Sequence, residues 1–144
     1  MNPNPVLRQL GYGTTERVVI VHADDLGMCQ ATLPAFADLL DFGLVASGAV
    51  MVPCAWFPAV ADWCHQHPAA DVGVHLTLTS EWQTYRWGPL STRDPASGLL
   101  DRAGYFHSSV AALRAQAEPD AVAVEMRLQL ARARQAGLEP THLD

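Results

Sequence analysis

Short apolar runs alternate with helical patterns along most of the chain. Residues 17–23 form a run rich in β-branched residues without alternation, which is typical of a strand buried on both faces of a parallel sheet. The sequence DDLG then breaks this run. Residues 44–52 predict a second strand, which Pro53 closes. Residues 71–79 predict a third, in which apolar residues alternate with polar ones that include His75, so one face is apolar and the other polar.

Amphipathic helical patterns follow the first two predicted strands. Residues 32–43 predict a helix with Thr32 as its N-cap and Gly43 at its end. Residues 56–67 carry apolar side chains at helical spacing and predict a second helix. Each helix lies where a crossover between two parallel strands is required.

The third predicted strand is followed by a long segment without periodicity, residues 80–107. A loop of this length in a compact domain is usually functional or disordered, and its aromatic residues favour a functional one. The rings could stack on a sugar or could form a satellite core cluster. Helical sequence resumes near Ser108 and is strongest over residues 119–137, and residues 140–144 look like the start of a fourth strand.

The order of these elements predicts an α/β fold with parallel strands and right-handed helical crossovers. A complete (β/α) barrel takes about 250 residues, so the chain is either about half of a barrel or a small open sheet. Its end inside a predicted strand favours the first interpretation. We expect a flexible lead-in over residues 1–16 and a single domain over residues 17–144, truncated at its fourth strand.

Composition narrows the class of protein. The 144 residues are 49% hydrophobic and 17% charged, which excludes an intrinsically disordered chain. A formal net charge of -6 argues against a nucleic-acid binder, because such proteins need a basic face. No apolar run approaches the roughly 20 residues of a membrane span. Cys29, Cys54 and Cys64 include no C-x-x-C pair and predict no disulfide framework. A cytoplasmic globular protein is expected.

Candidate chemistry lies at the predicted carboxyl ends of the strands, where active sites of parallel α/β proteins collect. Asp24 and Asp25 follow the first strand, and His75 lies on the polar face of the third. Adjacent carboxylates raise each other's pKa, and a divalent cation would remove this conflict, with His75 as a further ligand. Alternatively, the aspartates cap a turn and His75 is a packed interior histidine; the local pattern does not decide between the two.

Other histidines are weaker candidates. His22 lies beside the two acids and is either a partner of a ligand or a packed residue. Cys64, His65 and His67 lie close together, but no second ligand pair at zinc spacing accompanies them, so we expect no zinc site there. His107 is expected to be solvated.

Five segments together resemble the YdjC-like family of carbohydrate deacetylases, which includes chitooligosaccharide deacetylases and members associated with hopanoid biosynthesis. The segments are VVIVHADDLG (18–27), GLVASGAVMV (43–52), DVGVHLTLTS (71–80), LLDRAGYF (99–106) and PTHLD (140–144). The resemblance implies the N-terminal part of a distorted (β/α) barrel. It also implies a hydrolase that uses a divalent metal ion, Mg or Zn, to remove N-acetyl groups from amino sugars or oligosaccharides.

The resemblance also implies roles for individual residues. Asp24 would be the general base that activates water, and Asp25 and His75 would be metal ligands. The family usually has Asn and Phe where this sequence has His22 and Leu26, and the resemblance therefore does not extend to these two positions of the site. Family members continue past T-H-L-D into Ser-His-x-His, whose first histidine is the remaining ligand; His142 is not that ligand.

Two further hypotheses remain open. The same residues could serve a metal-assisted hydrolase of another amide or ester. Alternatively, the chain is a non-catalytic barrel fragment whose exposed strand edges associate into a homo-oligomer. For the 144-residue chain alone we expect at most weak metal binding and little turnover, because one ligand and half of the barrel are missing.

Overall fold

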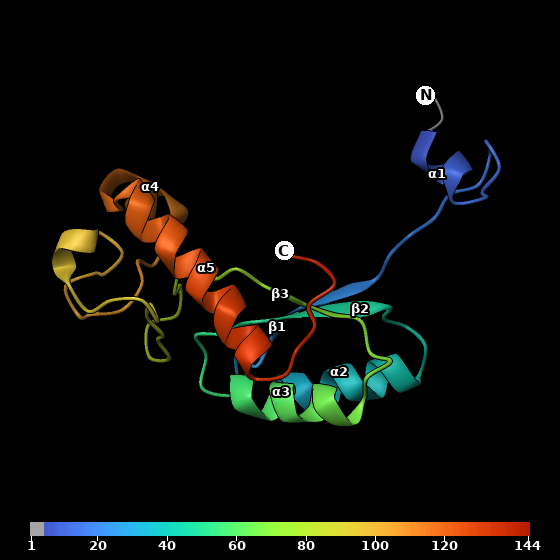
Figure 1. Ribbon diagram of the computed structural model, residues 1–144, viewed down its shortest axis with the longest axis horizontal. Helices are drawn as coiled ribbons and strands as arrows, with labels where there is room; N and C mark the ends of the chain where they lie inside the picture. Colours follow the sequence, from blue (N-terminus) through green and yellow to red (C-terminus); the bar gives the residue numbers. More distant parts are fainter. Residues whose placement is uncertain (1–4) are drawn as a thin grey trace.

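A parallel sheet with helical crossovers forms the centre of the molecule. The computed structural model describes residues 5–144 (Figure 1). The elements in chain order are α1 (Pro5–Gln9), β1 (His22–Leu26), α2 (Thr32–Asp41), β2 (Ser47–Val50), α3 (Phe57–Gln66), β3 (Val72–Val74), the 3-10 helix η1 (Pro95–Ser97), α4 (Val110–Gln116) and α5 (Pro119–Gln135). The three-stranded sheet has the order β1-β2-β3, and both pairings are parallel. The predicted α/β class and strand direction are confirmed.

The main core lies between the sheet and helices α2 and α3, which cover one of its faces (Figure 1). Phe36 of α2 and Val60 of α3 pack there with Val50 and Val74 from the strands, and all four are at most 1% exposed. Ala133 of α5 joins the same cluster. Burying one such large side chain stabilises the fold by roughly 1.5–3 kcal/mol, so this cluster fixes how the helices sit against the strands.

The start of α2 differs from its predicted cap. The N-cap position is Ala31, and its side chain makes no capping hydrogen bond. The hydroxyl of Thr32 instead accepts a hydrogen bond from the backbone N–H of Gly27 (2.9 Å) and donates one to the carbonyl of Cys29 (2.9 Å). Thr32 therefore ties the helix to the turn that follows β1. The predicted helix end is confirmed, because Gly43 adopts a left-handed φ of 78° directly after the helix.

The first strand lies further along the chain than predicted. Residues 17–23 were expected to be buried on both faces and to stop before the DDLG sequence, but β1 runs through Asp24 and Asp25 to Leu26. Val19 and Ile20 are 80% and 75% exposed. Before β1, the hydrogen bond nearest to the strand pairing with β2 is at Val21, whose carbonyl accepts from the N–H of Ala46 (2.8 Å). An apolar run predicts burial only where another element covers it, and within residues 5–144 none covers residues 18–21.

The third strand is short, and residues 140–144 continue the sheet beside it. Val74 forms a parallel bridge with Leu143. The N–H of Leu76 donates to the carbonyl of Asp144 (2.9 Å), and the N–H of Asp144 donates to the carbonyl of Val74 (3.0 Å). The predicted start of a fourth strand therefore pairs in parallel with the end of β3.

Beyond β3 the chain is held by a buried polar network rather than by a strand ladder. The amide of Gln129 on α5 accepts from the N–H of Thr77 (2.9 Å) and donates to its carbonyl (2.7 Å). The carboxylate of Glu125 accepts from Gln129 (2.8 Å) and from the backbone N–H groups of Leu90 and Ser91. Glu125 and Gln129 are both 0% exposed. Their hydrogen bonds replace the water that each polar group would otherwise require.

The long loop over residues 80–107 has its own small core. Trp87, Leu99 and Phe106 are buried together with Leu113 of α4 in a second cluster. Of the loop's other large aromatic residues, Trp82 is 56% exposed. The satellite-core interpretation is therefore correct for part of the aromatic set, and sugar stacking stays a prediction for the exposed rings.

The expectation for His107 was wrong. Its side chain is buried, with only 5% of the residue exposed, and its Nε2 makes a hydrogen bond with the carbonyl of Gly98 (2.9 Å). The N–H of Ser80 donates to the carbonyl of His107 (2.9 Å). His107 thus closes the base of the loop instead of facing solvent.

An ion pair inside this loop leads to a pH prediction. Burial raises the pKa of Asp101, but hydrogen bonds from the N–H groups of Tyr105 and Ala103 and from Arg86 (2.8 Å) outweigh it and lower the pKa overall. A lowered pKa means that the ionised carboxylate stabilises the fold above its unfolded pKa of about 3.9, and that this contribution is lost as pH falls through the folded value. We expect Asp101→Asn to lower the unfolding free energy by about 1 kcal/mol at pH 7.

Urea unfolding of the wild type and Asp101→Asn between pH 3 and pH 7 would measure this effect. The difference between the unfolding free energies of the two proteins should become smaller as the pH falls towards 3. A difference that stays constant over the whole range would show that the charge of Asp101 contributes nothing.

The N-terminal lead-in stands apart from the sheet (Figure 1). The prediction of a flexible lead-in covers residues 1–16, of which residues 1–4 lie outside the described part of the chain. Helix α1 forms within it and buries no residue. Among the helices of residues 5–144, none combines the length and the apolar character needed to cross a bilayer.

Candidate functional site

A bulge in β1 places the two adjacent aspartates. Ala23 pairs with Gly48 and Leu26 with Val50, so the register shifts across Asp24 and Asp25. Asp25 has a φ of 61°, a left-handed conformation that costs a non-glycine residue roughly 1–2 kcal/mol. Bulges and strained residues of this kind re-aim side chains and are common beside active sites.

The structure brings the side chains of Asp25 and His75 together. His75 follows β3 directly, and its Nε2 lies 3.4 Å from Oδ1 of Asp25 on β1. On the other side of the ring, Nδ1 lies 3.1 Å from Oδ2 of Asp144. The bulged strand, the end of β3 and residues 140–144 therefore meet around one imidazole.

Asp24 lies at the same edge but faces a different histidine. Its Oδ1 is 3.4 Å from Nε2 of His22, which in turn is 3.6 Å from Oδ2 of Asp144. The Nδ1 of His22 makes a 2.7 Å hydrogen bond with the hydroxyl of Ser47. Within residues 5–144, one group of three metal-ligating side chains has atoms that all lie within 4.8 Å of one another: His22, Asp24 and Asp144.

The carboxyl groups of Asp24 and Asp144 influence each other. Burial raises the pKa of Asp24, and the hydrogen bond and negative charge of Asp144 raise it further. The pKa of Asp144 is lowered, first by its hydrogen bond from His75 and then by the one from Asp24. The contact therefore favours the protonated form of Asp24 and the ionised form of Asp144.

Asp144 is a site residue that sequence reasoning missed. The available signal was an acid within a predicted parallel strand, because such strands carry the polar groups of a site at one edge of the sheet. His22 was expected to be either a partner of a metal ligand or a packed residue. Its contact with Asp144 depends on strand pairing across the whole sheet, which a local pattern does not contain.

His142 lies beside this cluster without joining it. Its ring packs edge-on against His22 with centroids 5.1 Å apart, and its Nδ1 lies 2.8 Å from the hydroxyl of Thr141 and 3.6 Å from Asp71. A hollow of about 550 Å³ opens over this part of the sheet and is lined by both histidines.

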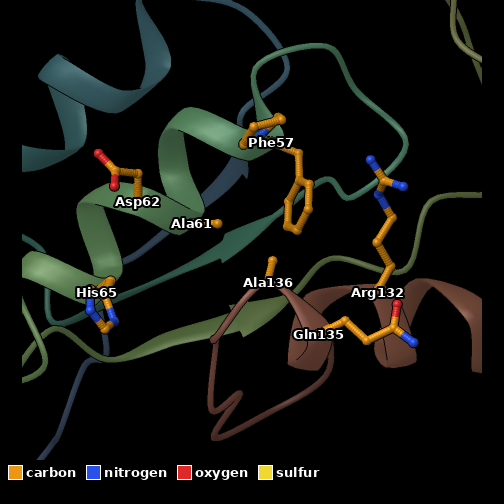
Figure 2. A pocket seen from close by; sticks show the side chains of 8 residues that line it. Phe57, Ala61, Asp62, His65, Arg132, Gln135 and Ala136 are labelled. Atoms are coloured by element: carbon orange, nitrogen blue, oxygen red, sulfur yellow. The ribbon is translucent and has the colours of Figure 1, made fainter.

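A second hollow, of about 530 Å³, lies between α3 and α5 and contains none of the predicted site residues (Figure 2). Phe57 of α3 and Arg132 of α5 face each other across it, with the guanidinium carbon 5.8 Å from the ring centroid. His65 also lines this groove, whereas Cys64 packs against the main core and His67 stacks on Trp63. These three neighbours therefore have different surroundings.

Comparison with known proteins relates this arrangement to sugar deacetylases. The chain is 41% identical over 139 residues to a carbohydrate deacetylase from Thermus thermophilus, a match that covers 96% of this chain and 47% of the relative. It is 36% identical over 64 residues to a chitooligosaccharide deacetylase from Yersinia enterocolitica, covering 44% of this chain and 25% of that protein. The chain spans about half the length of the carbohydrate deacetylases it matches.

A solved structure shares the fold. It is that of a protein from Enterococcus faecalis, provisionally described as a cellobiose-phosphate cleavage protein, with a TM-score of 0.75 and 28% identity over 87% of this chain and 46% of that chain. The likeness supports the prediction that the parallel sheet is part of a larger barrel-like fold. The family model for YdjC-like proteins matches residues 18–144, which include β1, its bulge, His75 and Asp144. The chain therefore belongs to the YdjC-like family.

Proposed function

We propose that this chain carries one half of the active site of a metal-dependent deacetylase that removes N-acetyl groups from amino sugars or oligosaccharides. The observation that carries the proposal is the convergence of Asp24, Asp25 and His75 at the carboxyl edge of the sheet. The names of the relatives from Thermus and Yersinia support the substrate class.

The donor atoms of Asp25 and His75 fit a divalent cation. Ligand atoms bind zinc at about 2.0–2.2 Å, so two ligands of one tetrahedral ion lie about 3.2–3.6 Å apart. The 3.4 Å between His75 Nε2 and Asp25 Oδ1 falls within this range. An imidazole nitrogen beside a carboxylate oxygen suits zinc better than magnesium, which prefers oxygen ligands.

Asp144 would act as a positioning residue for His75. When the Nδ1–H of His75 donates to Asp144 Oδ2, the lone pair of Nε2 is left facing Asp25. A carboxylate that fixes the tautomer of a ligating histidine in this way is common in metal sites. The lowered pKa of Asp144 keeps this acceptor ionised.

Asp24 would be the general base of the reaction. When bound, the cation supplies Lewis acidity that polarises the amide carbonyl and acidifies a water molecule. In its ionised form Asp24 would accept the proton of that water, because it lies next to Asp25 on the bulge and its raised pKa makes its carboxylate a stronger base. General-base catalysis contributes typically 10²–10⁴-fold, so Asp24→Asn is expected to lower kcat for acetate release from N-acetylated chitooligosaccharides by at least about 100-fold when the complete barrel is present.

Titration calorimetry with zinc and with magnesium tests the metal half of the proposal. We expect the wild-type chain to bind zinc weakly, because it spans about half the length of its relatives, and the Asp25→Ala, His75→Ala double variant to lose one bound equivalent. His65→Asn is a matched control, since this histidine lines the groove on α3 away from the site. Identical titrations for the wild type and the double variant would contradict the assignment of Asp25 and His75 as ligands.

A further inference from the structure

We propose that His22, Asp24 and Asp144 form a second divalent-cation site, separate from the Asp25–His75 pair, that takes a borderline transition metal such as zinc. The three side chains come from β1 and from residues 140–144, which lie on opposite edges of the sheet. One ligand atom from each lies within 4.8 Å of the other two.

The orientation of His22 supports this site. Its Nδ1 is 2.7 Å from the hydroxyl of Ser47, which can accept the Nδ1–H and leave Nε2 with a bare lone pair. That Nε2 atom is buried and makes no hydrogen bond within the described part of the chain. In this tautomer the lone pair faces Asp24 and Asp144, and the contact is repulsive when both carboxyl groups are ionised. A cation between the three groups would turn the repulsion into coordination.

The spacing of the donor atoms fits the same ion. His22 Nε2 is 3.4 Å from Asp24 Oδ1 and 3.6 Å from Asp144 Oδ2. Both separations fit the roughly 3.2–3.6 Å expected between ligands of one tetrahedral zinc. One nitrogen and two carboxylate oxygens leave the fourth position for water, and the imidazole disfavours magnesium.

The two sites are adjacent and share Asp144, because Oδ2 of Asp144 also accepts a hydrogen bond from Nδ1 of His75. A cation held by Asp24 would compete with a proton for that carboxylate. If Asp24 is the general base, which rests on the proposed function, saturating zinc should therefore slow deacetylation. Binding at the second site itself does not depend on that role.

Zinc stoichiometry, measured by titration calorimetry and by metal analysis after equilibrium dialysis, tests the inference. We expect the wild type to bind two equivalents of zinc. His22→Gln and the Asp25→Ala, His75→Ala double variant should each bind one equivalent, and a variant that combines all three substitutions should bind none. His65→Asn should retain two. Addition of zinc should also shift the imidazole ¹⁵N resonance of His22 Nε2 in the wild type.

The second site would be overturned if His22→Gln bound as many equivalents of zinc as the wild type. If His22→Gln fails to fold, Ser47→Ala takes its place, since it keeps all three ligands and removes only the hydrogen bond that orients the ring. It should weaken the second equivalent about 10-fold or more, as for other partners of metal ligands, and unchanged affinity would count against the site. A failure of the proposed function is distinguishable, because only the double variant would then bind like the wild type.

Discussion

Replacing Gly98 by alanine is expected to lower the free energy of unfolding by about 3–5 kcal/mol. A Cβ at this position would lie 1.9 Å from the carbonyl oxygen of Gln116 and 2.8 Å from the Cα of Ala117. Both are backbone atoms at the end of α4, so no side-chain rotation relieves the overlap. Gly98 also has a left-handed φ of 65°, which adds strain for any residue with a Cβ.

The matched control for this prediction is Gly104→Ala. Gly104 has a similar left-handed φ of 83°, but a Cβ there would meet nothing within 4 Å. It should therefore show the backbone strain alone, about 1–2 kcal/mol. For a domain of this size each 1 kcal/mol lowers Tm by roughly 2–4 °C, so thermal unfolding followed by circular dichroism separates the two variants. If both variants lost the same free energy of unfolding, the added Cβ at Gly98 would be accommodated by a movement of the loop away from α4 at no energetic cost.

The sequence predicted the order of strands and helices well because hydrophobic spacing reports which faces of an element are buried. Helices α2 and α3 have the predicted stripes, and their apolar residues form the main core. The position of β1 was harder to predict, because the apolar residues 18–21 lie exposed while the strand runs through two aspartates. A bulge breaks the period on which pattern reasoning depends.

In the candidate site, too, local sequence patterns predict individual residues but not the contacts between distant parts of the chain. Asp24 and Asp25 could be found because they directly follow a predicted strand, and His75 because it lies on the polar face of another. The contacts of Asp144 could not be found in this way, because they require residues 140–144 to pair with β3 in one particular register. Sequence spacing locates the predicted strands. Which histidine each carboxylate contacts is determined by the register of strand pairing, which the spacing does not contain.

That register depends on Gly73, and Gly73→Ala is expected to detach residues 141–144 from β3. A Cβ on Gly73 would lie 2.5 Å from Cδ2 and Nε2 of the His142 ring and 2.6 Å from its carbonyl oxygen. That carbonyl accepts from the N–H of Val74 (3.1 Å), so moving it breaks the pairing. The cost is about 1–3 kcal/mol, typical of overpacking. The amide hydrogens of Val74 and Leu76 should exchange roughly 10–100-fold faster, at about 1.4 kcal/mol for each factor of ten.

Detachment would also withdraw Asp144 from both histidines. We therefore expect Gly73→Ala to weaken zinc binding without removing any ligand of the Asp25–His75 pair. A Gly73→Ala, His142→Ala double variant is the informative comparison, because it removes the two ring contacts and leaves the carbonyl contact in place. In this double variant the amides of Val74 and Leu76 should regain only part of their protection from exchange. The reference for full protection is the His142→Ala single variant. Full recovery would assign the strain to the ring, and the backbone of residues 141–144 would then not be the element through which Gly73 holds Asp144 in the site.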